Sequence, residues 1–237
     1  MYLFLIQAIT DNTGHLDTDE SAHCIKVLRK KAGDTIHCID GKGNYYECTI
    51  ETVSKNGVSL YIHHKIAKYG EKNTGKITLA AAPLKQKDRY EWLIEKAVEL
   101  GVDEITPITT KHTISGNIKP ERLQNIIVSA TKQCKRGRFP VLNPVISFEN
   151  SLPQSANAAL KLIAYCEAEN HINTLHQEIL EASSLVLLIG PEGDFTPEEV
   201  AQAQKQGFHS VSLGKSRLRT ETAAIFGLSV LKMIKGY

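Results

Sequence analysis

The chain is predicted to be an α/β protein in which a small β-barrel precedes a parallel sheet. Within residues 1–72, short alternating segments such as DTIHCID and GVSLYIHHKI indicate strands separated by turns. Within residues 73–237, continuous apolar segments such as KITLAAAP and SLVLLIG alternate with amphipathic helical patterns. Continuous apolar strands joined by helices are typical of a parallel sheet that is covered on both faces. These two segments are the expected domains.

The first domain contains one expected helix among its strands. The segment SAHCIKVLRKKAG has helical spacing and ends at Gly33, a residue type that often stops helices. The dipeptide Asn56-Gly57 lies between two alternating segments, where it favours a two-residue hairpin turn. The pattern therefore predicts mostly antiparallel strands with a single helical connection.

The second domain begins its helices with recognisable signals. In DRYEWLIEKAVELGV, Asp88 and Glu91 fit a capping box, and Trp92 is expected in the core. In KPERLQNIIVSATKQC, Pro120 stands near the first helical position. The strand HSVSLG and the helix TETAAIFGLSVLKMIKG are expected to complete the domain.

Composition excludes several classes of protein. The formal net charge of +2 does not by itself argue for a nucleic-acid partner. No apolar run approaches the roughly 20 residues that span a membrane, so we expect no transmembrane helix. The N-terminus lacks the features of a signal peptide, so we expect a cytoplasmic protein. The five cysteines are scattered, without a CxxC pair or an HExxH motif, so we expect reduced thiols and no metal site.

The segment LIGPEGDFTPEEV concentrates turn chemistry where a strand becomes a helix. Gly190 and Gly193 permit backbone conformations that a side chain would oppose, and they let a ligand approach the main chain. Thr196, Pro197 and Glu199 are expected to cap the following helix, with Pro197 at its first position. A capped helix start beside acidic residues favours a neutral or cationic ligand over a phosphate.

A second loop, LGKSRLRTETAA at residues 213–224, also follows a strand and opens a helix. One such loop alone is equally explained by a well-made turn. Two of them at the carboxyl ends of parallel strands favour a ligand site. An NTPase phosphate loop is rejected because GEKNTGKI has Ile77 in place of the hydroxyl residue and precedes a strand instead of following one. The absence of a GxGxxG motif argues against a dinucleotide-binding site.

GPEGDFTPEE followed by LGKSRLRTETAA resembles the paired C-terminal signature of the bacterial ribosomal RNA small subunit methyltransferase E family. This family belongs to the SPOUT class of methyltransferases. The similarity continues through HCIKVLRKKAGDTIHCIDGKGNYYECTI, KQKDRYEWLIEKAVELGV and ATKQCKRGRFP. The resemblance implies a PUA-like β-barrel that binds RNA over residues 1–72. It also implies a SPOUT methyltransferase domain with a trefoil-knotted parallel sheet over residues 73–237.

The family's activity is implied in the same way. It is methyl transfer from S-adenosyl-L-methionine to N3 of a specific uridine in 16S small-subunit ribosomal RNA. The resemblance also implies that the enzyme is a homodimer and that it has no membrane partner.

Asp194 departs from the family's pattern, which often has Gly there, and Ser216 and Arg217 replace a common Arg-Ile. The residues that the resemblance assigns to the cofactor are Gly190, Pro191, Glu192, Gly193, Leu213, Gly214, Leu218, Arg219, Thr222 and Ala223.

Removal of the uridine N3 proton requires a base or a group that stabilises the resulting anion. Arg219 and Arg136 are candidates for placing positive charge near the uracil oxygens. Glu221 is a candidate base, although a first-turn carboxylate that favours the helix dipole explains it equally well. Neither loop contains a histidine, so no general base is assigned.

RNA binding requires basic surface, and the chain has three basic clusters. Each cluster alone is more often a solvated face. The candidate RNA-binding residues are Lys26, Arg29, Lys30, Lys132, Arg136, Arg138 and Arg217.

Two other functions remain open. One is a non-catalytic RNA-binding factor for ribosome assembly on the same fold, and the other is an α/β enzyme acting on a small molecule. Binding of S-adenosylmethionine would discriminate the first from an enzyme.

Overall fold

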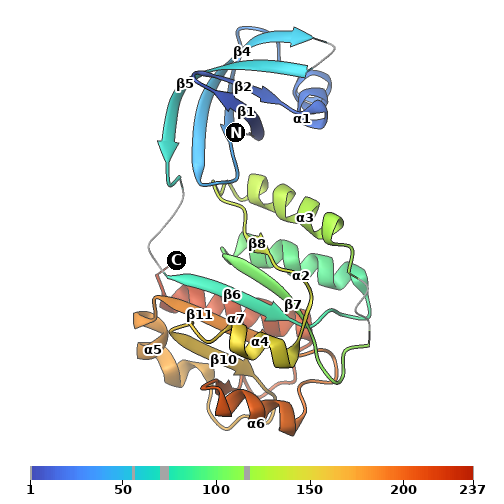
Figure 1. Ribbon diagram of the computed structural model, residues 1–237, viewed down its shortest axis with the longest axis vertical. Coiled ribbons are helices and arrows are strands. Elements are labelled where there is room, and N and C mark those ends of the chain that lie inside the picture. Colours follow the sequence, from blue (N-terminus) through green and yellow to red (C-terminus); the bar gives the residue numbers. More distant parts are fainter. Residues whose placement is uncertain (1, 55–56, 70–74, 115–117, 237) are drawn as a thin grey trace. The chain divides into compact units, whose positions relative to one another are not determined.

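The computed structural model describes residues 2–54, 57–69, 75–114 and 118–236 (Figure 1). The chain forms two compact units. Unit 1 contains Met1–Lys72 and Val128–Phe139, and unit 2 contains Asn73–Ile127 and Pro140–Tyr237. Residues 128–139, which we expected in the second domain, instead pack within unit 1.

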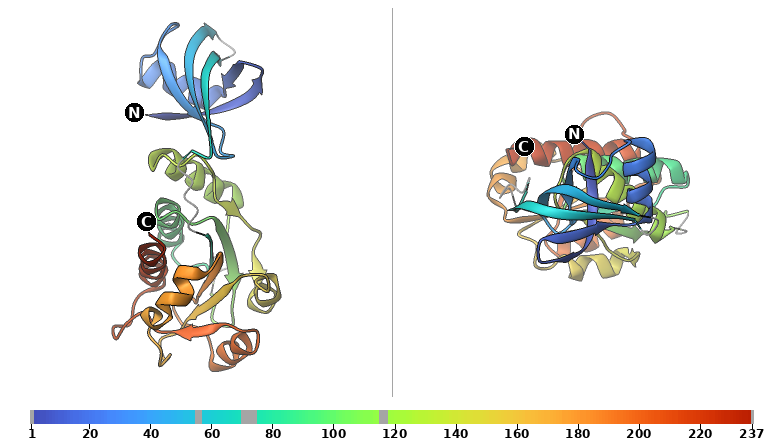
Figure 2. Two further views of the ribbon diagram at one scale, coloured as in Figure 1. Left: turned by 90° about the vertical axis from the view of Figure 1, so that its left-hand side faces the viewer. Right: turned by 90° about the horizontal axis from the view of Figure 1, so that it is seen from above.

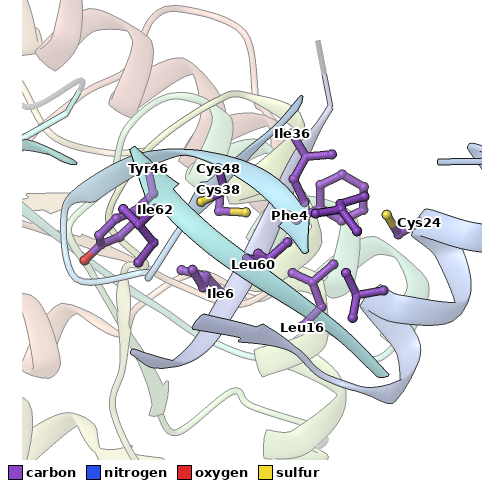
Figure 3. Packing of buried hydrophobic residues seen from close by; sticks show 12 residues of the cluster. Phe4, Ile6, Leu16, Cys24, Ile36, Cys38, Tyr46, Cys48, Leu60 and Ile62 are labelled. Atoms are coloured by element: carbon purple, nitrogen blue, oxygen red, sulfur yellow. The ribbon is translucent and has the colours of Figure 1, made fainter. Parts of the chain in front are cut away.

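Unit 1 is a closed five-stranded barrel. Its neighbours in order are β1 (Leu3–Thr10), β2 (Thr13–Leu16), β5 (Gly57–Ala67), β4 (Asn44–Ser54) and β3 (Thr35–Ile39). A parallel pairing between β1 and β3 closes the barrel, whereas the other pairs are antiparallel. Alternate residues point inward, and Phe4, Leu60 and the thiols of Cys38 and Cys48 fill the interior (Figure 3).

The helical connection of the barrel is shorter than the sequence predicts. It consists of α1 (Thr18–Ala22) and a π-helical turn, η1 (His23–Val27). Arg29 has a left-handed backbone with φ of 54°, which ends the helix well before Gly33. The expected hairpin residue Asn56 lies outside the described residues, while Ser54 and Gly57 on either side pair across β4 and β5.

Residues 128–139 are attached to the barrel by backbone and side-chain contacts. The Gly43 N–H donates to the Gly137 carbonyl at 2.9 Å, and the Phe139 N–H donates to the Gly41 carbonyl at 2.9 Å. Lys132 forms an ion pair with Glu20, and its side chain is only 15% exposed. Lys132 is therefore engaged in holding this segment within unit 1, which is a different environment from the solvated RNA-binding surface that we predicted.

Unit 2 is built on a parallel sheet. Its strand order is β12 (His209–Val211), β10 (Leu160–Ala164), β11 (Ser184–Ile189), β6 (Lys76–Ala81), β7 (Glu104–Thr109) and β8 (Val141–Leu142), and β9 (Ile146–Ser147) also pairs with β7. The central strands β11 and β6 pair although more than a hundred residues separate them in the chain. These strands are almost fully buried, as their continuous apolar sequences predict.

Helices cover both faces of this sheet (Figure 2). α4 (Phe148–Gln154) and α6 (Pro197–Lys205) pack on one face, while α2 (Lys87–Glu99) and α7 (Thr220–Ile234) pack together on the other. The remaining helices are α3 (Pro120–Gln133), α5 (His176–Glu181) and the 3-10 turn η2 (Ile172–Leu175). No helix of the described residues combines the length and the apolar character needed to cross a membrane.

Two predictions about α2 are wrong. Its N-cap is Gln86, which makes no side-chain capping bond, and Glu91 forms a bidentate ion pair with Arg122 of α3 in place of the expected capping box. Trp92 is 45% exposed, because it lies on the solvent side of the helix, opposite the buried Leu93 and Ile94. The predicted start of α3 at Pro120 is confirmed.

Candidate functional site

A cavity of about 700 Å³ in unit 2 lies at the carboxyl ends of its parallel strands. The loops after β10, β11 and β12 form most of its wall, at residues 164–167, 189–197 and 212–221. Arg89 of α2, Ala223 of α7 and His112, from the loop after β7, complete it. Both loops that the sequence singled out therefore face a single cavity.

The β11–α6 loop is held by hydrogen bonds from three neighbouring loops. The Lys85 N–H donates to Glu192 Oε1 at 3.2 Å, and the Cys166 N–H donates to Asp194 Oδ2 at 3.0 Å. His112 Nδ1 lies 3.0 Å from the carbonyl oxygens of both Gly193 and Asp194. The acidic side chains that we expected to attract a ligand thus also fix the loop to its surroundings.

The start of α6 is capped as the sequence predicts. Thr196 Oγ1 accepts the Glu199 N–H at 3.2 Å, Glu199 Oε2 accepts the Thr196 N–H at 2.8 Å, and Pro197 takes the first helical position. Glu199 Oε1 also accepts the Lys111 N–H at 2.9 Å. Because these groups are paired, the helix start has little capacity left for a phosphate.

The two glycines of this loop lie so close to neighbouring atoms that a side chain would collide with them. Neither Gly190 nor Gly193 has a left-handed backbone; within this loop that conformation occurs at Asp194, with φ of 61°. A Cβ at Gly190 would lie 3.1 Å from the Phe195 nitrogen, and one at Gly193 would lie 3.0 Å from His112 Cβ. A side chain at either position would therefore displace the surrounding loop.

The β12–α7 loop is more open. Gly214 has φ of 130° and a free space where a Cβ would stand, and the side chains of Arg217 and Arg219 are exposed. Arg219 is the N-cap residue of α7, with its carbonyl accepting the Ala223 N–H at 2.7 Å. This loop brings positive charge to the cavity without burying it.

Acidic and basic groups share the cavity. Glu221 Oε1 lies 3.8 Å from Arg89 Nη1, and the Glu221 side chain is 12% exposed. The Tyr165 hydroxyl donates to Glu167 at 3.0 Å, and burial raises its pKa. Burial and the Asp194 carboxylate raise the pKa of the Cys166 thiol to about 11, so this cysteine is protonated at neutral pH.

The structure brings most of the predicted site residues together. Every residue assigned to the cofactor lines the cavity except Thr222, which is exposed elsewhere on the first turn of α7. Arg219, Glu221 and Arg217 line it as well. Arg136 belongs to unit 1 and is absent from the described cavity wall, as are the other predicted RNA-binding residues, Lys26, Arg29, Lys30, Lys132 and Arg138.

Several residues of the cavity wall were not predicted from the sequence. The loop after β10 was detectable in principle, since Tyr165, Cys166 and Glu167 directly follow a continuous apolar strand. His112 is also close to a strand end, three residues after β7. Arg89 lies within a helix, and only the packing of α2 against α7 brings it beside Glu221.

Comparison with known proteins agrees with this geometry. A family model described as an RNA methyltransferase domain matches residues 71–232, and one described as an RNA methyltransferase PUA domain matches residues 16–61. The ribosomal RNA small subunit methyltransferase E of Mesomycoplasma hyopneumoniae is 40% identical over 234 residues, covering 97% of this chain and 98% of the relative. The chain belongs to the ribosomal RNA small subunit methyltransferase E family.

Solved structures of similar proteins confirm the predicted fold class. The crystal structure of a probable rRNA-methyltransferase from Porphyromonas gingivalis has a TM-score of 0.90 and 35% identity, covering 99% of this chain and 98% of that one. The family's enzyme from Neisseria gonorrhoeae, bound to S-adenosyl methionine, has a TM-score of 0.87 and 28% identity, covering 98% and 97%. The barrel is thus a PUA-like domain, and the parallel sheet is a SPOUT-type methyltransferase domain.

Proposed function

We propose that this chain transfers a methyl group from S-adenosyl-L-methionine to N3 of a specific uridine in 16S small-subunit ribosomal RNA, as a cytoplasmic homodimer. The observation that carries this proposal is the shared cavity of the GPEG and LRTETA loops at the carboxyl ends of β11 and β12. Family membership and the S-adenosylmethionine bound to the Neisseria gonorrhoeae relative support the choice of cofactor.

The cavity fits this cofactor in size and chemistry. Its volume of about 700 Å³ falls within the range of roughly 300–1,000 Å³ typical of cofactor sites. Gly193 and Gly214 expose main-chain groups, and Leu213 and Leu218 add apolar surface. When bound, S-adenosylmethionine supplies an electrophilic methyl group on a cationic sulfur, which the carboxylates of Glu167 and Asp194 suit electrostatically.

Within this site, side chains of the protein would orient the reactants and stabilise the negative charge that develops on the uracil. The exposed guanidinium of Arg219 would stabilise negative charge as it develops on the uracil oxygens. Arg89 would hold Glu221 in place. Both side chains stand on the wall of the cavity, where positioning accounts for much of the acceleration of a methyl transfer.

Basic residues proposed to contact RNA occur on each of the two units, taken separately. Lys26, Arg29 and Arg138 are exposed on unit 1, and Arg217 is exposed on unit 2. Lys132 no longer belongs to this set, since Glu20 pairs with it in unit 1. Lys30 and Arg136, both half-buried, remain candidates. Neutralising phosphates with such residues makes RNA affinity fall with salt.

A second copy of the chain is the proposed partner of the exposed apolar side chains of α7 and α2. Phe226 and Met233 are 40% and 80% exposed on α7, and Trp92 is 45% exposed on the adjoining α2. Ala223, which is also on α7, lines the cavity, so this part of α7 adjoins the proposed cofactor site. Sedimentation of the wild type and of Phe226→Asp would test the dimer. The trefoil knot that the resemblance implies remains a prediction.

The experiment that tests the function has two stages. Calorimetric titration with S-adenosylmethionine should give about one site per subunit. The protein is then incubated with small-subunit ribosomal RNA, either naked or in assembled subunits, and the digested RNA is analysed by mass spectrometry for 3-methyluridine. Cofactor binding with 3-methyluridine on one nucleotide is the expected result. RNA binding without cofactor binding would instead support the non-catalytic assembly factor.

A further inference from the structure

His112 is placed in the cavity by a segment that neither family loop includes. It lies in the turn after β7, and its exposed side chain lines the cavity wall. Its Nδ1 is 3.0 Å from the Gly193 carbonyl oxygen and 3.0 Å from the Asp194 carbonyl oxygen. The imidazole is thus fastened by one nitrogen to the loop proposed to hold the cofactor.

These two contacts determine which ring nitrogen carries the proton. A carbonyl oxygen can only accept a hydrogen bond, so Nδ1 must be the donor. In the neutral imidazole, the lone pair then resides on Nε2. Nε2 of the neutral ring can therefore accept a proton, and His112 is part of the cavity wall.

The surroundings hold this ring in position. The Lys111 N–H, next to His112 in the chain, donates to the buried Glu199 at 2.9 Å. The absence of a side chain at Gly193 leaves room for the ring, because a Cβ there would come within 3.2 Å of Nδ1. A base whose other nitrogen is fixed by an acceptor is the arrangement that general-base histidines use.

The other candidate bases of the described cavity wall are engaged or protonated. Tyr165 and Cys166 both have raised pKa values, through burial and an adjacent carboxylate. The carboxylates are occupied by neighbouring groups: Glu167 by the Tyr165 hydroxyl, Glu192 by the Lys85 N–H, Asp194 by the Cys166 and Phe195 N–H groups, and Glu221 by Arg89.

We propose that His112 is the general base of the reaction and accepts the uridine N3 proton at Nε2. This inference rests on the proposed function. The N3–H bond breaks, its proton moves to Nε2, and its electron pair forms the bond from N3 to the methyl carbon. The bond between that carbon and sulfur breaks, and its electron pair stays on sulfur. The imidazolium then returns the proton to solvent.

The test uses a substitution that separates proton transfer from loop positioning. In His112→Asn, the amide N–H can still donate to the Gly193 carbonyl, but no basic nitrogen remains. His112→Ala removes both features. His209→Asn is the matched control, since His209 is an exposed histidine at the opposite end of β12 from the cavity. Single-turnover formation of 3-methyluridine and calorimetric affinity for S-adenosylmethionine are measured for each protein.

We expect His112→Asn to lose roughly 100-fold in single-turnover rate, the lower range for loss of a general base. Its cofactor affinity should stay within about threefold of wild type. Imidazole in solution should partly restore the rate of His112→Ala, and His209→Asn should match the wild type.

A rate above about a third of wild type in His112→Asn would overturn the proposal. So would a rate loss explained entirely by weaker cofactor binding, which would make His112 a positioning residue only. Absence of 3-methyluridine in the wild-type reaction would instead refute the proposed function itself, and the inference with it.

Discussion

The two loops that wall the cavity differ in how they are held. The β11–α6 loop receives hydrogen bonds from the loops after β6, β7 and β10, and its helix start is capped. The β12–α7 loop has an internal contact between Ser212 and Gly214 and leaves Arg217 and Arg219 exposed. The first loop is preorganised by its neighbours, whereas the second presents positive charge to a molecule that binds in the cavity. Both loops line the proposed cofactor cavity, but substitutions in the first should act mainly through cofactor binding, whereas those of the exposed arginines in the second should act on catalysis and RNA binding.

The largest expected effect is in the open loop. Arg219→Ala should lower the single-turnover rate by roughly 10²–10³-fold, because it removes positive charge from the developing uracil anion. The melting temperature should hardly change, since the side chain is exposed and makes no capping bond. The matched variant Arg217→Ala should raise the RNA concentration needed for half-maximal rate and leave the rate at saturation. If both variants showed the same change, the distinction between the two arginines would be wrong.

The next effect is in the fastened loop. Gly193→Val should weaken S-adenosylmethionine binding by at least about 100-fold, or about 2.7 kcal/mol. The reason is that a Cβ there meets His112 at 3.0 Å, and the branched side chain would also cover the main chain. Calorimetric titration measures the loss, and Gly193→Ala should show a smaller one. Unchanged affinity in the valine variant would contradict the assignment of this loop to the cofactor.

Variants of Asp194 test whether the attachment of the β11–α6 loop to the β10 loop contributes to cofactor affinity. Asp194→Ala loses the bond to the Cys166 N–H and places alanine in a left-handed backbone, so cofactor affinity should fall by roughly tenfold. Asp194→Asn should stay close to wild type, because asparagine tolerates this conformation and its side-chain oxygen can accept the same bond. Equal affinities for the two variants in a titration would mean that the attachment to the β10 loop is unimportant.

The smallest effect concerns stability alone. Thr196→Ala removes the N-cap of α6 and should cost about 1 kcal/mol, which lowers the melting temperature by roughly 2–4 °C in a chain of this size. Calorimetric melting measures this change, and Thr196→Ser serves as the control because its hydroxyl can still accept the Glu199 N–H. A serine variant that melted as early as the alanine variant would show that the hydroxyl is not responsible.

Features that depend on local patterns could be predicted from the amino-acid sequence. The continuous apolar strands, the caps at Pro120 and Thr196, and the two family loops could all be recognised without coordinates, because each depends on residues close together in the chain. The PUA-like and methyltransferase domains followed from the resemblance, and the comparisons confirm both.

Features that join distant segments of the chain could be found only in the folded structure. The pairing of Lys132 with Glu20 joins positions 112 residues apart, and the contact of His112 with the Gly193 carbonyl joins positions 81 apart. Local periodicity carries no information about such contacts, since they depend on strand order and helix packing. For the same reason Trp92 was misplaced: its helical neighbours are buried, but the side of α2 that it occupies faces outward.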